Sequence, residues 1–210
     1  MFVSAVLSVT SDANPWCHAL RLRMKAFVDF RTPAAGFDQP IEMWLACHER
    51  ILRMAALVVR LCEHLAGGGS IEAAGVTATS ILRYFDEAAP RHHEDEELTL
   101  FPRLLAHLQG ADRQKLERTV DDLRYDHGRL ERSWTALRPA LVAITSGTTV
   151  SLDTEATVGF VTDYREHVER ENNVLAPAFR RAFDAAELEA IGRAMAARRG
   201  LDWDELCAWK

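Results

Sequence analysis

The sequence predicts an all-α protein built on a four-helix bundle. Four long stretches carry apolar residues at the three- and four-residue spacing of an amphipathic helix. The connections between these stretches are short, and no alternating strand pattern of useful length is present. Long amphipathic helices joined by short connections bury their apolar faces by packing side by side, which favours a bundle.

The first two helices of the predicted bundle are delimited by glycine and proline. The first follows a Pro/Gly loop at residues 32–40 and ends at the three glycines 67–69, a strong helix stop. The second is expected from about residue 74 to 107 and is closed by Gly110. Pro90 and Pro102 should bend it, because each proline removes a backbone donor.

The third helix begins at Asp112 and has the most regular apolar stripe, with Pro139 near its end. The fourth runs from about residue 153 to 183. Asp184 and Glu187 resemble a capping box, which would start a fifth, shorter helix that Gly200 ends.

Three regions are therefore expected. Residues 1–36 form an N-terminal extension, residues 37–185 the bundle, and residues 186–210 a C-terminal helix and tail. Residues 17–30 of the extension are amphipathic, and a peripheral helix or poorly ordered segment is favoured over a membrane-surface or partner-binding helix.

Composition excludes several classes of protein. A formal net charge of −6 argues against nucleic acid as the partner, since phosphate binding needs a basic face. No apolar run approaches the roughly 18 residues of a membrane span, and the apolar start of the chain lacks the basic region of a signal peptide. The four cysteines form no Cys-x-x-Cys pair, which argues against a thiolate zinc site and fits a reducing compartment. A cytoplasmic location is expected.

Polar residues interrupt the apolar stripe of every bundle helix. Each stripe contains one histidine, and two stripes add a glutamate one turn later. A single such histidine is more often a hydrogen-bonded core residue than a ligand. Two buried ionised carboxylates, however, would cost many kcal/mol unless a cation compensated them. The six candidate metal ligands are His48, His92, Glu96, His127, His167 and Glu171.

This ligand set also indicates which metal is bound. It combines imidazole and carboxylate without thiolate, and six protein ligands are too many for one tetrahedral zinc ion. They suit two iron or manganese ions, with Glu96 and Glu171 positioned to bridge them. Zinc or a single metal ion remains an alternative.

Other polar residues near these positions are assigned away from the metal. His93 points about 100° around the helix from His92 and is expected near the ligands or at the surface. Glu94, Asp95 and Glu97 are expected to form a solvated acidic face. His64 lies roughly 160° around the helix from His48 and is expected not to bind metal. Tyr125 and Tyr164 could donate hydrogen bonds to the ligands, but core packing is favoured for both. His18 and His107 are expected at the surface.

Two of the motifs share one spacing, in which Glu follows His by four residues, Leu by eight and Pro by ten. They are His92-His93-x-x-Glu96-Glu97-x-x-Leu-Phe-Pro and His167-x-x-x-Glu171-Asn-Asn-Val-Leu-x-Pro. Together with Cys47-His48-Glu49-Arg50-Ile51 and Asp126-His127-Gly128, they resemble the HHE cation-binding domains of the hemerythrin-like family.

The resemblance covers roughly residues 37–185 and implies an up-down four-helix bundle with a non-haem di-iron centre. It implies four terminal histidine ligands and two bridging glutamates, at the six positions given above. Two departures argue against a pure oxygen carrier. Glu131 stands where oxygen-carrying hemerythrins have a second histidine on the third helix, and His167-x-x-x-Glu171 replaces their His-x-x-x-x-Asp. The family's iron–sulfur repair members have an N-terminal cysteine pair, whereas this N-terminus has only Cys17. The resemblance therefore does not support a repair activity.

The sequence therefore predicts a di-iron protein that binds or senses a small diatomic ligand such as oxygen or nitric oxide. The ligand pocket would be lined by residues such as Phe85, Trp134 and Phe160, and a sensing role would require a partner protein. The alternatives are a di-iron redox enzyme acting on oxygen, peroxide or nitric oxide, and an iron-handling or structural bundle.

Overall fold

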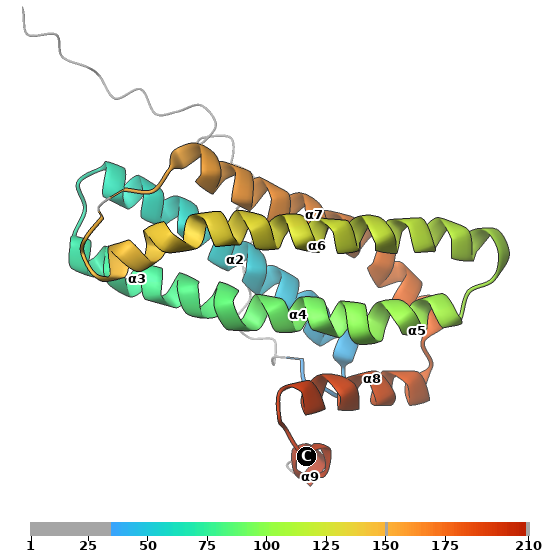
Figure 1. The fold of residues 1–210 in the computed structure, drawn as a ribbon. Helices are drawn as coiled ribbons and strands as arrows, with labels where there is room; N and C mark the ends of the chain where they lie inside the picture. The colour runs from blue at the N-terminus through green and yellow to red at the C-terminus, as the bar shows by residue number, and fades with distance from the viewer. Residues whose placement is uncertain (1–34, 150, 209–210) are drawn as a thin grey trace, which may run out of the picture. The chain divides into compact units, whose positions relative to one another are not determined.

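The bundle that the sequence predicts is present in a computed structural model, which describes residues 35–149 and 151–208 (Figure 1). The first bundle helix is α2 (Pro40–Ala66). The third and fourth are α6 (Gly110–Thr145) and α7 (Thr154–Ala182). The second is a continuous run of short segments: α3 (Ile71–Arg83), η1 (Tyr84–Ala88), α4 (Ala89–Asp95), η2 (Glu96–Leu100) and α5 (Phe101–Ala106). No strand occurs within these described ranges.

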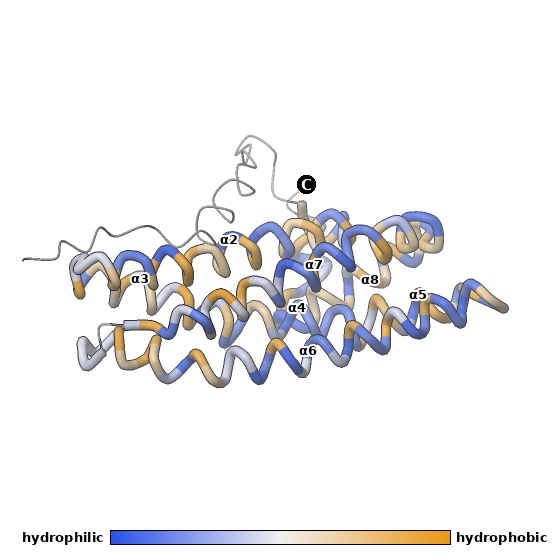
Figure 2. The backbone as a smooth tube through the Cα atoms, turned by 90° about the horizontal axis from the view of Figure 1, so that it is seen from above, coloured by the Kyte–Doolittle hydropathy of each residue, from blue (hydrophilic) through white to orange (hydrophobic). Residues whose placement is uncertain are grey.

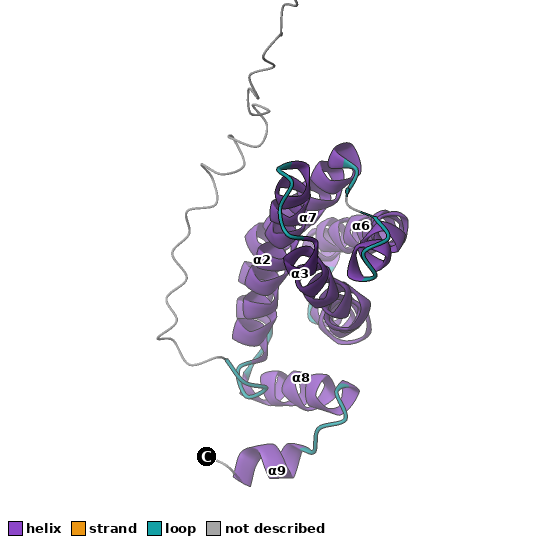
Figure 3. Ribbon diagram, turned by 90° about the vertical axis from the view of Figure 1, so that its left-hand side faces the viewer, coloured by secondary structure: helices purple, strands orange, loops and turns teal. Residues whose placement is uncertain are grey.

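The long helices follow an up-and-down order. Each packs against its neighbours in sequence, and α2 closes the bundle by packing against α7 (Figure 3). Apolar and polar residues alternate along each helix, as Figure 2 shows, so that one face of each helix can be buried. The core includes Trp44, Phe101, Leu123 and Phe179, none of which exposes any side chain.

The two prolines that were expected to bend the second helix each follow a π segment. The N–H of Ala89 bonds the carbonyl of Tyr84, and the N–H of Phe101 bonds that of Glu96, five residues back instead of four. The wider turn accommodates a proline, which has no N–H and whose ring clashes with the carbonyl four residues earlier. Such turns are rare overall, but those that occur are often found at functional sites.

Aspartate side chains cap the starts of two helices, and the cap at Asp184 was predicted from the sequence. Asp153 caps α7 by accepting a bond from the Ala156 N–H at 2.6 Å. Asp184 caps α8 (Ala185–Arg198) through the Glu187 N–H at 2.9 Å. The expectation for Gly110 was wrong: the second bundle helix already ends at Ala106, and Gly110 is the first residue of α6.

The C-terminal helices lie outside the bundle (Figure 3). α8 contacts α2, α4 and η2, and the short α9 (Trp203–Ala208) contacts α8. At Gly192 in α8, an added Cβ would lie 2.0 Å from the carbonyl oxygen of Phe37, so only glycine allows this close approach.

Part of the predicted organisation cannot be compared with the structure. The amphipathic segment 17–30, the apolar start of the chain, Cys17 and His18 all lie outside the described residues. Among the helices that are described, none has the length and apolar character needed to cross a membrane.

Candidate metal centre

The six candidate ligands meet in the interior of the bundle, although they come from all four bundle helices. His48 lies on α2, His127 on α6, and the His–Glu pairs lie on α4–η2 and α7. Both glutamates expose none of their side chain. The four histidines are between 1% and 5% exposed: His48 1%, His92 2%, His127 5% and His167 2%.

One half of the centre is formed by His48 and His92. The Nε2 atom of His92 lies 3.1 Å from Oε1 of Glu96. The Nε2 atom of His48 lies 3.2 Å from Oε2 of Glu171 and 3.7 Å from Oε1 of Glu96. The four side chains each offer one ligand atom, and these atoms lie within 4.8 Å of one another.

The other half is formed by His127 and His167, with the opposite oxygens of the same glutamates. Nε2 of His127 lies 3.2 Å from Oε2 of Glu96, and Nε2 of His167 lies 3.3 Å from Oε1 of Glu171. The two Nε2 atoms are 3.2 Å apart. Each carboxylate therefore directs one oxygen to each histidine pair.

Several atoms of this cluster are buried without a hydrogen-bond partner in the described part of the chain. They are Nε2 of His48 and His92, Oε2 of Glu96 and both carboxylate oxygens of Glu171. Buried polar atoms without partners are costly, and each of these atoms can coordinate a metal cation. The residues therefore fit a metal site.

The charges of the cluster lead to the same conclusion. Burial would raise the pKa of the Glu96 carboxyl, but His92 and His127 hold it well below its ordinary value. Burial would lower the pKa of His127, yet the Glu96 carboxylate raises it to about 9. The glutamates are thus kept ionised by positive charge on the imidazoles, and bound cations can replace those protons.

Comparison with known proteins identifies the family. Residues 39–179 match the model of the hemerythrin HHE cation binding domain, which covers more than half of the chain. The chain belongs to the hemerythrin HHE family. A Haemophilus influenzae protein described as uncharacterized is 31% identical over 165 residues, which span 79% of this chain and 92% of that protein. The buried histidine–glutamate cluster lies within the matched HHE domain.

Neighbouring side chains orient three members of this histidine–glutamate cluster, which is called the HHE cluster below and consists of the six candidate ligands. Trp44 donates a 2.6 Å hydrogen bond from Nε1 to Oε1 of Glu96. Nδ1 of His48 lies 2.7 Å from Oδ1 of Asn172, and Nδ1 of His127 lies 2.6 Å from Oε1 of Glu97. Contacts to Nδ1 hold the opposite ring nitrogen toward the cluster, as such outer partners do in metal sites.

Sequence reasoning did not identify these orienting residues. Trp44 lies one turn before His48 on α2, and Asn172 directly follows Glu171 on α7. Each bonds a ligand on another helix, Trp44 bonding Glu96 and Asn172 bonding His48, and the periodicity of one helix does not indicate such contacts. Glu97 was expected in a solvated face, but its carboxylate bonds His127.

The acidic face expected at residues 94–97 was wrong for Asp95. Glu94 is exposed as expected, whereas Asp95 is 0% exposed. Arg199 contacts its Oδ2 at 2.7 Å, and Arg198 bonds its Oδ1. Both arginines come from the end of α8, and periodicity within one helix does not reveal which later helix covers it.

The structure also tests the positions of the remaining polar residues. His64 is exposed and bonds the carbonyl of Ser70, as expected for a residue away from the cluster. Tyr164 is buried, but Tyr125 is 70% exposed, so the core position expected for Tyr125 was wrong.

His93 lies inside the bundle, with its ring stacked on that of His127 at a centroid distance of 4.1 Å. Burial and then the positive charge of His127 lower the pKa of His93 well below its ordinary value.

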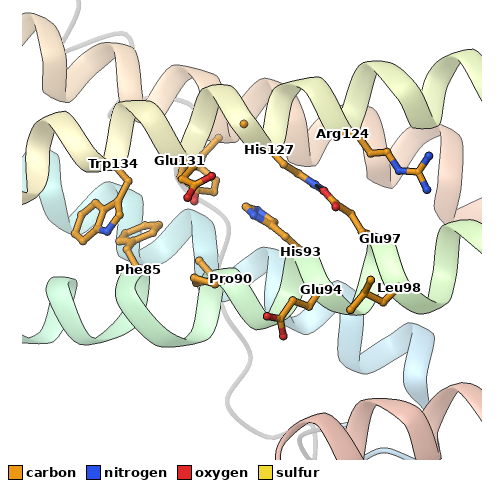
Figure 4. Close-up of a pocket in the computed structure, with 13 residues that line it drawn as sticks. Phe85, Pro90, His93, Glu94, Glu97, Leu98, Arg124, His127, Glu131 and Trp134 are labelled. Atoms are coloured by element: carbon orange, nitrogen blue, oxygen red, sulfur yellow. Dashed lines mark hydrogen bonds and ion pairs between the residues drawn. The ribbon is translucent and has the colours of Figure 1, made fainter.

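A pocket of about 450 Å³ opens between α4 and α6 beside the HHE cluster (Figure 4). Phe85 and Trp134 line it, as the sequence predicts. Phe160 packs against Phe85 at a ring distance of 5.0 Å and does not line the pocket. His93 and His127 form part of the lining, so the pocket connects the surface with one side of the cluster.

Proposed function

We propose that the domain at residues 37–185 holds a non-haem di-iron centre and binds or senses a small diatomic ligand such as oxygen or nitric oxide. One observation carries this proposal. The fully buried carboxylates of Glu96 and Glu171 each present one oxygen to each of two histidine pairs. The six proposed ligands are His48, His92, Glu96, His127, His167 and Glu171.

The choice of iron rests on the chemistry of these donors. Imidazole nitrogen and carboxylate oxygen suit iron, and two ions sharing carboxylates between four helices are typical of di-iron bundles. Within the described residues, no cysteine belongs to either set of ligand atoms. Manganese and zinc accept the same donors, so metal analysis has to distinguish the three.

The pocket supports the binding of a small ligand. It leads from the surface to His93 and His127, and Phe85 and Trp134 give part of it an apolar wall. Iron, when bound, supplies the affinity for oxygen or nitric oxide. The protein supplies a path with a partly apolar wall and holds the histidine rings in fixed orientations.

One feature of the same pocket favours a di-iron redox enzyme as the second candidate. A volume of about 450 Å³ lies within the range of small-molecule sites and exceeds what a diatomic ligand fills. Glu97 and Glu131 also line it and could exchange protons with a bound molecule. Reversible spectral change on exposure to oxygen would support binding, whereas peroxide turnover would support the enzyme.

Metal content and an optical spectrum test the proposal directly. Protein from iron-supplemented cells is expected to contain close to two irons per chain, with a near-ultraviolet oxo-to-iron band. Glu96→Ala and Glu171→Ala should lose this metal, because each removes a shared ligand. His64→Ala is the matched control and should retain both ions, since His64 is exposed and away from the cluster. The proposal would be contradicted if the wild-type protein bound no Fe(II) under anaerobic conditions.

A further inference from the structure

Among the described residues, His93 is the histidine inside the bundle centre that the proposed function leaves without a role. It follows His92 on α4, and an ideal helix would separate the two side chains by about 100°. The ring nevertheless lies between α4 and α6, as Figure 4 shows. Its Nε2 atom is buried and has no hydrogen-bond partner in the described part of the chain.

Two histidines of the centre lie beside this ring. His93 stacks nearly parallel on His127, with an interplanar angle of 11°. It meets His167 at a centroid distance of 6.0 Å and an angle of 74°. One ring nitrogen from each of these three histidines lies within 4.8 Å of the others. A metal ion about 2.1 Å from each nitrogen would hold the nitrogens within roughly 4.2 Å of one another. The nitrogens must therefore move closer together, and the His93 ring must tilt out of its stack on His127, because an imidazole lone pair lies in the plane of its ring.

The opposite helix, α6, has no second histidine one turn after His127. Glu131 lies one turn after His127 on α6, where a histidine would give that helix a second imidazole ligand. Glu131 and His93 line the same pocket from opposite helices. A histidine at position 131 would therefore enter the same pocket from the opposite helix.

We infer that His93 supplies a third imidazole to the metal position formed by His127 and His167. This inference rests on the proposed metal centre. The position on the other side of the bridging carboxylates has only His48 and His92, so the two metal ions would have unequal ligands. The position with His93 would also be the one nearer to the pocket.

Cobalt(II) is a suitable probe, because its visible spectrum reports the number and type of its ligands. Wild-type protein titrated anaerobically is expected to bind two cobalt ions. His93→Gly should bind the first ion normally and the second at least tenfold more weakly, since even the loss of an outer partner costs about 10- to 100-fold in affinity. Added imidazole should restore the second ion and its spectrum, because the pocket leads from solvent to the vacated place.

A second variant separates ligation from packing. Glu131→His in the His93→Gly background is expected to restore the second cobalt ion without added imidazole. His64→Gly is the control, and its cobalt titration should respond neither to the substitution nor to imidazole. Circular dichroism of the metal-free variants establishes that each is folded.

The outcomes are distinguishable. Two cobalt ions bound by His93→Gly with wild-type affinity and spectrum would overturn the role of His93 and leave the metal centre standing. A weakened second ion that neither imidazole nor Glu131→His restores would also overturn it, because packing alone would then explain the loss. Wild-type protein that binds no cobalt or iron would remove the metal centre itself.

Discussion

Two consecutive acidic residues, Asp95 and Glu96, are both fully buried, and they are neutralised in different ways. The carboxylate of Asp95 faces α8 and is held by Arg198 and Arg199. The carboxylate of Glu96 faces the bundle interior, where it contacts His48, His92 and His127. One residue thus anchors the C-terminal helix, and the next contributes to the proposed metal centre.

The contact of Asp95 is expected to be important for stability. Asp95→Asn leaves two arginines, each less than one-fifth exposed, without their carboxylate. Removing one partner of a buried ion pair typically costs about 3 kcal/mol or more of unfolding free energy. Urea denaturation of the metal-free protein measures this loss.

Glu189→Ala is the matched control, because its Arg193 partner also lies on α8 but the pair is about half exposed. An exposed pair of this kind contributes at most about 0.5 kcal/mol. Equal effects of the two substitutions would contradict the role assigned to Asp95.

The residues that were placed correctly from the sequence are those whose burial depends only on their position around a single helix. His48, His92, His127 and His167 all lie on apolar stripes, and the stripes face the core. Asp95 was misplaced because its partners come from α8, about 100 residues later. His93 was expected near the ligands or at the surface, and helical rotation alone did not decide between the two; its ring stacks on that of His127.

At the scale of elements, the second bundle helix is the one that departs from regular geometry. Its π segments begin at Tyr84 and Glu96, and each ends just before a proline-containing turn. They bracket α4, which carries His92 and His93. Sequence reasoning identified the prolines but not the π turns, because a proline in a helix can be accommodated by a bend or by a wider turn.

The packing of α8 gives a prediction at the same scale. Gly192→Ala would place a Cβ 2.0 Å from the carbonyl oxygen of Phe37, so backbone atoms have to move. Overpacking of this kind typically costs about 1–3 kcal/mol. The unfolding free energy from chemical denaturation should fall by that amount.

Gly159→Ala provides the opposite expectation on α7. A Cβ there meets no atom within 4 Å, and alanine is the better helix former by about 0.5–1 kcal/mol. The two glycine substitutions should therefore change stability in opposite directions. A gain in stability for Gly192→Ala would show that α8 does not pack tightly against the segment before α2.

At the scale of the whole molecule, the bundle is organised around a polar interior. Apolar residues such as Trp44, Phe101 and Phe179 fill one side of the cluster, and Phe85, Phe160 and Tyr164 the other. All-α class and helix order follow from periodicity and loop length, which are local properties of the sequence. The docking of α8 and the open pocket depend on how separate helices meet, and no local pattern encodes them.

A protein that buries ionised carboxylates and imidazoles together should depend on its metal for much of its stability. A ligand that binds only the folded state adds about 2.7 kcal/mol when its free concentration is 100 times its Kd. For a chain of this size, each kcal/mol raises Tm by roughly 2–4 °C, so saturating Fe(II) should raise Tm by about 5–10 °C. Differential scanning calorimetry under anaerobic conditions measures the shift, and a chelator should reverse it.

The same measurement on Glu96→Gln separates metal binding from general salt effects. That variant keeps the size of the side chain but loses the charge that both proposed metal positions share. Its Tm should be nearly independent of Fe(II), whereas His64→Gln should respond as the wild type does. An equal rise in all three proteins would place the stabilising metal outside the bundle interior, because only a site that includes Glu96 can distinguish them.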